Sequence, residues 1–300
     1  MRSEMGENDI YRSTLVTPAS SLKMMEKAAG AVSDILLFDL EDAVAPDQKA
    51  AARENILNTL ASLDLKNKEW GIRINGVHTP YFFDDLLLFL EISRPLTVVL
   101  PKADSREDVV ILDSMVSQLE LKNPALSPMR IQVLIESASG LERINEVCQA
   151  SARVTAVIFG AGDYTADTGA SFTKNGLFYG RSRIPVAAAF AGIQPIDNVF
   201  PDFRNLQGLE EDARLGKELG FSGKWAIHPA QVEVINKVFS PTVEEVEKAK
   251  KIIKAYEEAK AKGIGAISVD NQMIDEAVLK IMQRRASLAK KVGSWDKVEM

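Results

Sequence analysis

The chain has 300 residues, of which 46% are hydrophobic and 26% are charged, as is usual for a folded globular protein. This composition excludes a disordered or fibrous class, and the length suits one large α/β domain as well as two ordinary ones. The formal net charge of -6 argues against a nonspecific binder of nucleic acid or anionic membranes, because both need a basic surface. An anionic small substrate stays open, since a few Arg and Lys in a cleft can bind it.

Residues 1–14 are polar and mixed in charge, and no apolar run reaches about 18 residues. We therefore expect neither a signal peptide nor a transmembrane helix. We expect a cytoplasmic location. The single cysteine, Cys148, lies among apolar residues of a helical pattern, where we expect a buried small side chain and not a nucleophile.

Short apolar runs alternate with amphipathic stretches along the chain, a rhythm that is typical of a parallel sheet. The predicted strands are Ser13 to Thr17, Ile35 to Leu40, Trp70 to Asn75, Leu96 to Pro101, Arg130 to Ile135, Val154 to Gly160, Ile196 to Val199 and Lys224 to His228. The helical patterns are Ser21 to Val32, Asp47 to Leu63, Arg106 to Leu121, Leu141 to Ala150, Arg183 to Ala191 and Leu209 to Leu219. These alternations predict a closed (β/α)8 barrel. An open doubly wound sheet is the competing fold, but Gly160-Ala-Gly162 lacks the third glycine of a dinucleotide fingerprint.

The pattern changes after Ser240, where a long charged helix is predicted from Val243 to Lys262. A break at Gly263-Ile-Gly265 follows, and a second helix is predicted from about Gln272 onward. We therefore divide the chain into a barrel domain, residues 1–240, and a C-terminal helical extension, residues 241–300. By itself this extension has the pattern of a solvated helical hairpin, and residues 290–300 have that of a tail.

Several predicted strands end in polar residues, and the carboxyl ends of barrel strands are where active sites lie. Glu136 and Asp163 follow neighbouring strands, which lie about 4.8 Å apart in a sheet, so their carboxylates can converge on one cation. Two carboxylates completed by water are typical of a magnesium site. Each could equally cap the helix that follows it, and spacing alone leaves both interpretations open.

Histidine and cysteine are too few for a zinc site, because the chain has only His78 and His228 and no cluster at ligand spacing. His228 ends the last predicted strand, where it suits either a general base or a hydrogen-bonded structural residue.

Arg73 lies inside an apolar strand, where a guanidinium is costly to bury unless it is paired or faces a polar cavity. Glu41 and Asp42 end the adjacent strand and are its expected partners. The group is either a structural ion pair or one that also binds an anionic substrate. Lys49 and Arg53 are one turn apart on the next helix and are expected on a solvated face, although one could reach Asp42.

Seven motifs in fixed order resemble one family. They are Arg12-Ser13, DLEDAVAPDQKAAAR from Asp39 to Arg53, RIN at Arg73, PKAD at Pro101, IESASG at Ile135, FGAGD at Phe159 and AIHP at Ala226. Together they resemble the citrate lyase beta-subunit-like family of the HpcH/HpaI aldolases, a group that includes malyl-CoA, β-methylmalyl-CoA and citramalyl-CoA lyases. The resemblance spans nearly the whole chain and is more specific for the family than for the substrate.

This resemblance implies a TIM barrel with a C-terminal lid and Mg²⁺ bound by Glu136 and Asp163. It implies that Arg73 contacts the reacting oxygens and that Arg12 and Lys23 help to hold the coenzyme. Ala161 and Gly162 could then bind the carboxylate of a 2-oxo acid through their amides.

The segment from Val269 to Asp275 resembles the family's Met-Ile-Asp signature, whose aspartate is carried by a lid that covers a neighbouring subunit's site. The resemblance thus implies a catalytic Asp275 and a homo-oligomer, a trimer or hexamer. Without it, Asp275 is a helix-initial carboxylate favoured by the helix dipole. The chain departs from the family at Thr17-Pro18-Ala19, where Val-Pro-Gly is usual, and at Asn271, where glycine is usual.

The implied reaction is the cleavage of a 3-hydroxyacyl-CoA with a second carboxylate into acetyl-CoA or propionyl-CoA plus glyoxylate or pyruvate. Magnesium would bind the hydroxyl oxygen and carboxylate, Arg73 would stabilise the enolate, and Asp275 would transfer the proton. Two alternatives stay open. One is a malyl-CoA thioesterase, and the other is the beta subunit of a citrate lyase complex that acts on an acyl carrier protein.

Overall fold

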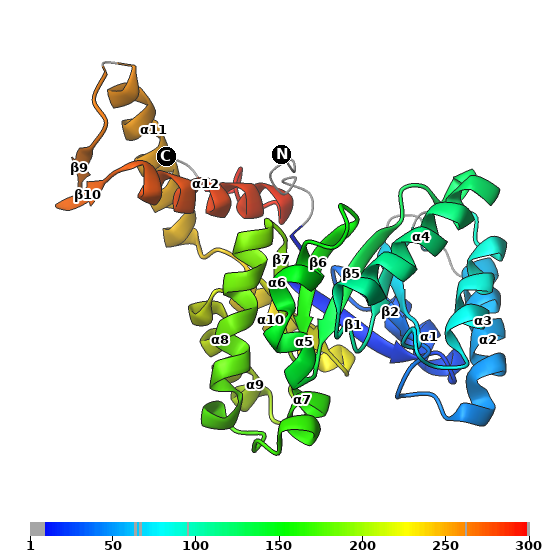
Figure 1. The fold of residues 1–300 in the computed structure, drawn as a ribbon. Coiled ribbons are helices and arrows are strands. Elements are labelled where there is room, and N and C mark those ends of the chain that lie inside the picture. The colour runs from blue at the N-terminus through cyan, green and yellow to red at the C-terminus, as the bar shows by residue number, and fades with distance from the viewer. Residues whose placement is uncertain (1–9, 63–64, 66–67, 95, 262, 299–300) are drawn as a thin grey trace. The chain divides into compact units, whose positions relative to one another are not determined.

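The computed structural model describes residues 10–62, 65, 68–94, 96–261 and 263–298. The chain divides into two compact units, one containing Tyr11–Lys237 and another containing the residues from Val238 onward (Figure 1). The division falls inside helix α10 (Pro229–Phe239), slightly before the boundary expected at residue 240.

Eight parallel strands close into a barrel in sequence order, so the predicted fold is confirmed. The strands are β1 (Ser13–Pro18), β2 (Ile35–Asp39), β3 (Glu69–Arg73), β4 (Thr97–Leu100), β5 (Arg130–Ile135), β6 (Val154–Phe159), β7 (Gln194–Asp197) and β8 (Gly223–Ala226). Each pairs with its neighbours along the chain, and β1 pairs with β8 to close the ring. All eight predicted strands are present.

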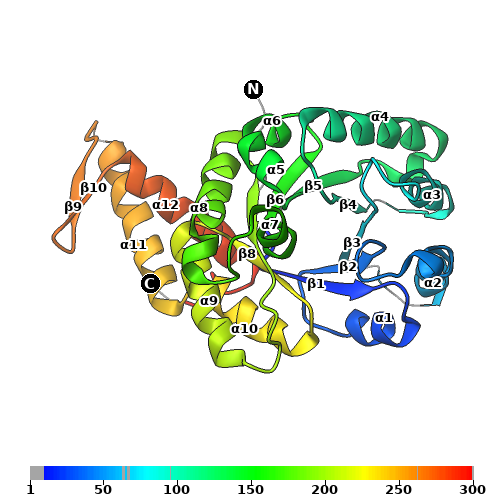
Figure 2. The same ribbon diagram turned by 60° about the horizontal axis from the view of Figure 1, so that its bottom comes forward.

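Helices surround the ring of strands, as Figure 2 shows for α1, α2, α4 and α8. The barrel unit has α1 (Leu22–Ala29), α2 (Lys49–Ser62), α3 (Phe82–Leu87), α4 (Arg106–Lys122), α5 (Ala138–Glu142), α6 (Ile144–Cys148), α7 (Ala161–Thr168), α8 (Lys174–Ala191), α9 (Leu206–Leu219) and α10, with short 3₁₀ turns at Pro46–Gln48, Leu88–Glu91 and Pro124–Leu126. Helix α8 begins well before the expected Arg183, because the Thr173 side chain caps it by accepting from the Gly176 amide.

The barrel interior is filled by apolar side chains that point inward from strands around the ring. They are Val16, Leu37, Val99, Leu134, Ala156, Ile158, Ile196 and Trp225. Side chains alternate along a strand, so Asp39, two residues after Leu37, also points inward, at the carboxyl end of β2. The apolar core thus ends where the polar site begins.

Strand β7 starts at Gln194 and not at the predicted Ile196. Gln194 is fully buried, and its side chain replaces a backbone partner. Its Oε1 accepts from the Tyr11 amide at 3.1 Å, and its Nε2 donates to the Tyr11 carbonyl at 2.6 Å. A polar residue can therefore open a buried strand here, which hydrophobicity alone does not predict.

The second unit contains α11 (Val243–Lys260), a hairpin of β9 (Ile267–Val269) and β10 (Gln272–Ile274), and α12 (Glu276–Lys291). The prediction of a helix from Gln272 is wrong for its first residues, which form β10 after a turn at Asp270 and Asn271. The predicted tail is also wrong for the residues described, because Trp295 and Val298 pack into an apolar cluster with Val246. Cys148 is buried as expected.

Among the residues that the structure describes, no helix is both long and apolar enough to cross a membrane.

A buried charge network joins β7 and β8 to the helices outside them. The ammonium of Lys224 lies 2.8 Å from Asp197 Oδ2 and 2.7 Å from Asp212 Oδ2, and its side chain is fully buried. The Arg181 guanidinium lies 2.6 Å from Asp197 and 2.8 Å from Asp212. Two cations thus balance two carboxylates inside the unit that carries the site.

We expect Lys224→Met to lower the free energy of unfolding by about 3–5 kcal/mol, because it leaves a buried carboxylate incompletely paired. Urea denaturation measures this loss. The matched control is Lys237→Met, which removes an exposed ammonium 3.4 Å from Glu210 and should change the free energy of unfolding much less. Equal losses in the two variants would contradict the role given to the network.

Candidate functional site

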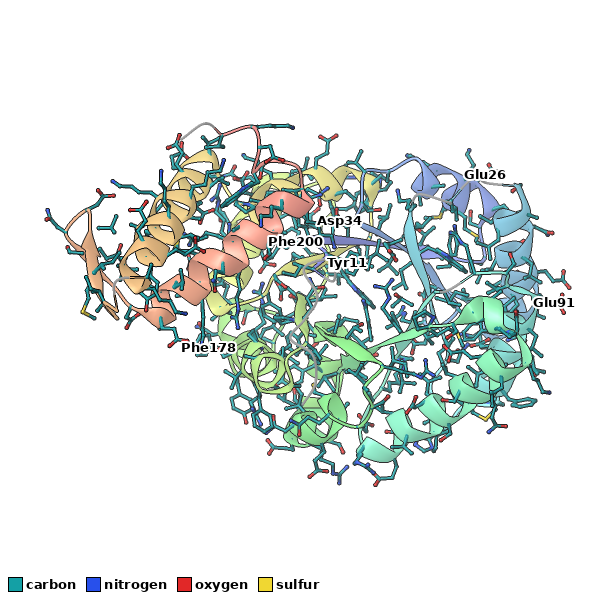
Figure 3. The ribbon with its side chains drawn as sticks, turned by 90° about the horizontal axis from the view of Figure 1, so that it is seen from above. Tyr11, Glu26, Asp34, Glu91, Phe178 and Phe200 are labelled. Atoms are coloured by element: carbon teal, nitrogen blue, oxygen red, sulfur yellow. The ribbon has the colours of Figure 1, made fainter. Side chains whose placement is uncertain are left out.

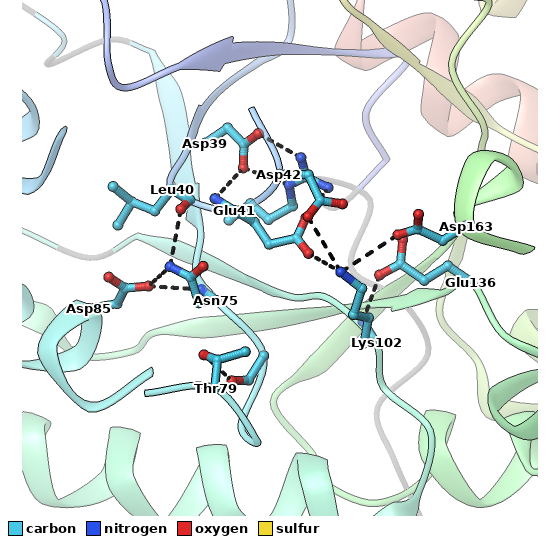
Figure 4. Close-up of polar contacts among 12 residues, drawn as sticks. Asp39, Leu40, Glu41, Asp42, Asn75, Thr79, Asp85, Lys102, Glu136 and Asp163 are labelled. Carbon is cyan, nitrogen blue, oxygen red and sulfur yellow. Dashed lines mark hydrogen bonds and ion pairs between the residues drawn. The ribbon is translucent and has the colours of Figure 1, made fainter. Parts of the chain in front are cut away.

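Charged side chains gather at the carboxyl ends of strands β2 to β6 (Figure 4). They are Asp39, Glu41, Asp42, Arg73, Lys102, Glu136 and Asp163. Because the strands are parallel and adjacent, residues far apart in sequence meet at one edge of the barrel. The predicted pair, Glu136 and Asp163, lies in this cluster, and both carboxylates face Lys102 in Figure 4.

Arg73 is held in a fixed position by two carboxylates. Its Nε and Nη2 donate to the two oxygens of Asp39 at 2.7 and 2.6 Å, a bidentate pairing. Its Nη1 lies 2.9 Å from Glu41 Oε2. Burial opposes the charge, but Asp39 and Glu41 outweigh it and raise the pKa of Arg73 above its ordinary value. The guanidinium is therefore a fixed positive charge.

The expected partners of Arg73 were half correct. Glu41 pairs with it, but Asp42 is more than half exposed and lies 3.5 Å from the Lys102 ammonium instead. Asp39, the stronger partner, was missed. Its signal was its position two residues after Leu37, on the inward face of β2.

Lys102 follows β4 and contacts three acidic side chains. Its Nζ lies 2.5 Å from Glu41, 3.5 Å from Asp42 and 3.8 Å from Asp163. Its backbone amide donates to Glu136 Oε1 at 2.7 Å. Sequence reasoning noted the Pro-Lys-Ala-Asp strand end but gave Lys102 no role.

The surroundings of Glu136 disfavour the ionised form of its side chain. Its side chain is buried, and burial together with the negative charges of Glu41 and Asp163 raises the pKa of Glu136 well above its ordinary value. A cation placed against Glu136 and Asp163 would offset this cost. Among the described residues, no group of three or more His, Cys, Asp or Glu could hold a metal ion.

Helix capping does not account for Glu136, because the next residue performs it. The Ser137 side chain accepts from the Gly140 amide and caps α5. Asp163 lies in the first turn of α7, whose cap, Gly160, has no side chain to offer. Its place there is favoured by the helix dipole. Neither carboxylate therefore caps the helix that follows it, and Asp163 keeps only the favourable interaction with the helix dipole.

The backbone that carries Glu41 is held by hydrogen bonds from the side chain of Lys49. Lys49 was expected on a solvated face, but it is buried, and its Nζ donates to the carbonyls of Leu40 and Glu41 at 2.7 and 2.8 Å. Burial lowers the pKa of Lys49, although nearby Asp85 opposes this. Its two carbonyl partners fix the backbone beside the site.

Arg53 was also expected on a solvated face, and it too is bound. Its Nη1 lies 2.7 Å from Asp85 Oδ1, while Asp85 Oδ2 accepts from the Asn75 amide at 2.8 Å. Asp85 is fully buried, so helices α2 and α3 are tied to the end of β3. These contacts were missed because they depend on tertiary packing and not on helix periodicity.

Arg12 lies away from this cluster. It precedes β1 and therefore stands at the amino end of the barrel, where Figure 3 labels the neighbouring Tyr11 and Asp34. Its Nη2 lies 2.7 Å from Asp34 Oδ1, and its Nε donates to Asp34 Oδ2 at 3.0 Å. The structure does not bring Arg12 to the carboxyl-end site.

Lys23 is exposed in the first turn of α1, which follows β1 at the carboxyl end of the barrel.

His228 has the contacts of a structural residue. Its Nδ1 accepts from the Ala230 amide at 3.1 Å, and its ring stacks on Phe203 with centroids 4.9 Å apart.

Asp275 belongs to the second unit. It is the N-cap of α12, where its Oδ1 accepts from the Val278 amide at 3.0 Å. The sequence pattern alone predicts this position for Asp275, as a carboxylate at the start of a helix. Asn271, where the family usually has glycine, adopts a left-handed conformation with φ of 60°.

The chain is similar to known proteins over most of its length. The family described as HpcH/HpaI aldolase/citrate lyase matches residues 12–229. The L-malyl-CoA/beta-methylmalyl-CoA lyase of Cereibacter sphaeroides (strain ATCC 17025 / ATH 2.4.3) is 35% identical over 90% of this chain and 91% of its own. The mitochondrial citramalyl-CoA lyase of Homo sapiens is 35% identical over 93% and 85%.

Citrate lyase subunit beta of Leuconostoc mesenteroides subsp. cremoris is 33% identical over 95% of each chain. Among solved structures, protein CitE from Mycobacterium tuberculosis in complex with magnesium, acetoacetate and coenzyme A is similar, with a TM-score of 0.75 and 30% identity over 94% of this chain and 98% of that one. Because the family match includes every barrel strand and relatives align over almost the whole chain, the chain belongs to the HpcH/HpaI aldolase/citrate lyase family.

Proposed function

We propose that this protein is a magnesium-dependent carbon–carbon lyase that cleaves a 3-hydroxyacyl-CoA carrying a second carboxylate into an acyl-CoA and a 2-oxo acid. The observation that carries the proposal is the pairing of buried Glu136 with Asp163 beside the fixed guanidinium of Arg73. Malyl-CoA and citramalyl-CoA lyases among the relatives support this substrate class.

The residues present fit a divalent cation. Glu136 lies near two like charges, and burial opposes its ionisation, so the pair lacks a positive partner of sufficient charge. Glu41 Oε2 is also buried without a hydrogen bond, although Arg73 lies near it. Glu136 and Asp163 would hold Mg²⁺, which supplies a Lewis acid for the substrate's hydroxyl and carboxylate oxygens.

Arg73 stabilises the negative charge that develops on substrate oxygens as the carbon–carbon bond breaks. Asp39 and Glu41 hold the guanidinium, so it needs no reorganisation during the reaction. We assign the binding of the 2-oxo acid's carboxylate to the amides of Ala161 and Gly162, which lie at the start of α7. Space is open beside Gly162, where an added Cβ would meet no atom within 4 Å.

Proton transfer to the enolate carbon is assigned to Asp275, and Lys23 is assigned to the coenzyme. We propose that the protein is a homo-oligomer, a trimer or hexamer, in which the second unit of one subunit covers the site of its neighbour. The hairpin before Asp275 supports a covering role, because Met273 is a large apolar side chain that is two-thirds exposed. The similarity to a citrate lyase subunit beta keeps a subunit of a larger complex as the second candidate.

The activity is tested with purified protein, Mg²⁺ and either malyl-CoA or citramalyl-CoA, with 2-oxo acid and free thiol measured separately. We expect oxo acid without thiol. Thiol without oxo acid would indicate a thioesterase, and activity only after adding acyl carrier protein would indicate a complex subunit.

Asp163→Asn should lower kcat/KM more than about 100-fold, the upper range for loss of an outer-shell group. Unchanged activity of Asp163→Asn would reject the metal pair.

Gly160, which follows β6, has no side chain, and this lets the backbone lie in close contact with the side chain of Glu136. A Cβ on Gly160 would lie 2.4 Å from Glu136 Cβ and 2.6 Å from Oε2. Gly160→Ala should therefore displace Glu136, weaken Mg²⁺ binding measured by calorimetry, and lower the free energy of unfolding by about 1–3 kcal/mol.

The matched control is Gly162→Ala, which adds the same methyl group where space is open. It should leave Mg²⁺ binding unchanged and stabilise α7 by up to about 1 kcal/mol, the usual effect of removing a helical glycine. If both variants bound Mg²⁺ equally well, the geometry given to Glu136 would be incorrect.

The shared lid is tested by mixing Asp275→Ala and Arg73→Ala subunits, each inactive alone. If the lid acts on a neighbour in a closed ring, random assembly restores about a quarter of the active sites. Turnover after unfolding and refolding the mixture measures this recovery. Activity no higher than that of the separate variants would show that Asp275 serves its own barrel.

A further inference from the structure

Lys102 has no assigned part in the proposed reaction, yet its ammonium lies among the acidic side chains of the site. Nζ is 2.5 Å from Glu41 Oε1 and 3.8 Å from Asp163 Oδ2, and Asp42 is 3.5 Å away (Figure 4). One of these carboxylates, Asp163, is a proposed metal ligand. The ammonium therefore binds where a divalent cation would also be attracted.

The backbone of Lys102 serves the other proposed ligand. Its φ is 49°, a left-handed conformation that costs a residue with a side chain on the order of 1–3 kcal/mol. In this conformation the amide donates to Glu136 Oε1 at 2.7 Å. Lys102 thus contacts both proposed ligands, Glu136 through its backbone and Asp163 through its side chain.

The two cations of the cluster differ in freedom. The Arg73 side chain is 12% exposed and held by the bidentate contact with Asp39, whereas the Lys102 side chain is 46% exposed on a flexible stem. The cluster contains five carboxylates, and these two cations leave it with excess negative charge. Lys102 is the member that can change partner when another cation arrives.

We propose that Lys102 is an internal counter-ion that sets the affinity of the site for its divalent cation. In the metal-free protein the ammonium balances Glu41 and Asp163. When the metal binds, the ammonium leaves Asp163 and remains on Glu41 and Asp42. This inference rests on the metal pair proposed above. Lys102 is a positioning residue that stabilises the empty site and, by repulsion between like charges, weakens the binding of the metal.

The sign of this effect distinguishes it from a structural role. A residue that only supported the carboxylates would weaken metal binding when it was removed, because the ligands would become disordered. A counter-ion that competes with the metal has the opposite effect, and its removal tightens binding. Coulomb repulsion across a few ångströms in a water-like dielectric corresponds to about tenfold in the dissociation constant.

The test uses Mn²⁺ as the probe, titrated by calorimetry into chelator-treated protein at pH 8. Lys102→Met and Lys102→Gly both remove the ammonium and keep the amide that donates to Glu136, and glycine also adopts the left-handed φ without strain. Each should bind Mn²⁺ about tenfold more tightly than the unmodified protein. Each should also gain more in melting temperature on adding Mn²⁺, because tighter binding stabilises more.

Two controls separate charge from other effects. Lys102→Arg keeps the positive charge and should bind Mn²⁺ as the unmodified protein does. Lys237→Met removes an exposed ammonium that pairs with Glu210 and should also leave the affinity unchanged. Equal or weaker Mn²⁺ binding by both Lys102→Met and Lys102→Gly would overturn the role of Lys102. Failure of the unmodified protein to bind Mn²⁺ would instead reject the metal pair, and this inference with it.

Discussion

The site depends on the burial of one guanidinium inside the mouth of the barrel. A charge at the end of an apolar strand is stable only if it is fully paired, and Arg73 has Asp39 on one side and Glu41 on the other. Asp39 also accepts from the Glu41 amide at 2.9 Å, so the same carboxylate orients the loop that bears the second partner. Lys49 holds that loop through the carbonyls of Leu40 and Glu41. The position of Arg73 thus fixes the geometry of the residues that follow β2.

Once Arg73 is paired, the remaining carboxylates are left with too little positive charge. Burial raises the pKa of Glu41 even though Arg73 and Lys102 oppose it, and burial also raises the pKa of Glu136. Folding alone would not favour placing Glu136 and Asp163 side by side at the end of an apolar barrel. Their arrangement is explained if the cluster is built to accept a further cation, with Lys102 as the adjustable charge.

Much of the fold was predictable because each barrel strand is an apolar run between turn residues, and that signal is local. That Glu136, Asp163 and Arg73 lie at one edge of the barrel was predictable because parallel strands place their carboxyl ends together. The start of β7 was not predictable, because the polar side chain of Gln194 is buried in hydrogen bonds with the distant backbone of Tyr11. The burial of Lys49 and the ion pair of Arg53 with Asp85 were missed for the same reason: helix periodicity placed both residues on a polar face, and their tertiary partners overrode it. The hairpin before Asp275 was not predicted, because its strands are short and its turn is formed by Asp270 and Asn271 instead of glycine.

The proposed role of Asp275 in proton transfer is compatible with the contacts made by the residues of the barrel cluster. Arg73 and Lys102 are held charged by acidic neighbours that raise the pKa of each, so neither serves as a base. Asp39 and Glu41 accept from those cations, and Glu136 accepts from the Lys102 amide. His228 uses Nδ1 to bind the Ala230 amide and stacks on Phe203. These contacts give the residues named here structural or electrostatic tasks, and the proposed proton transfer by Asp275 would add a carboxylate that is not part of this cluster.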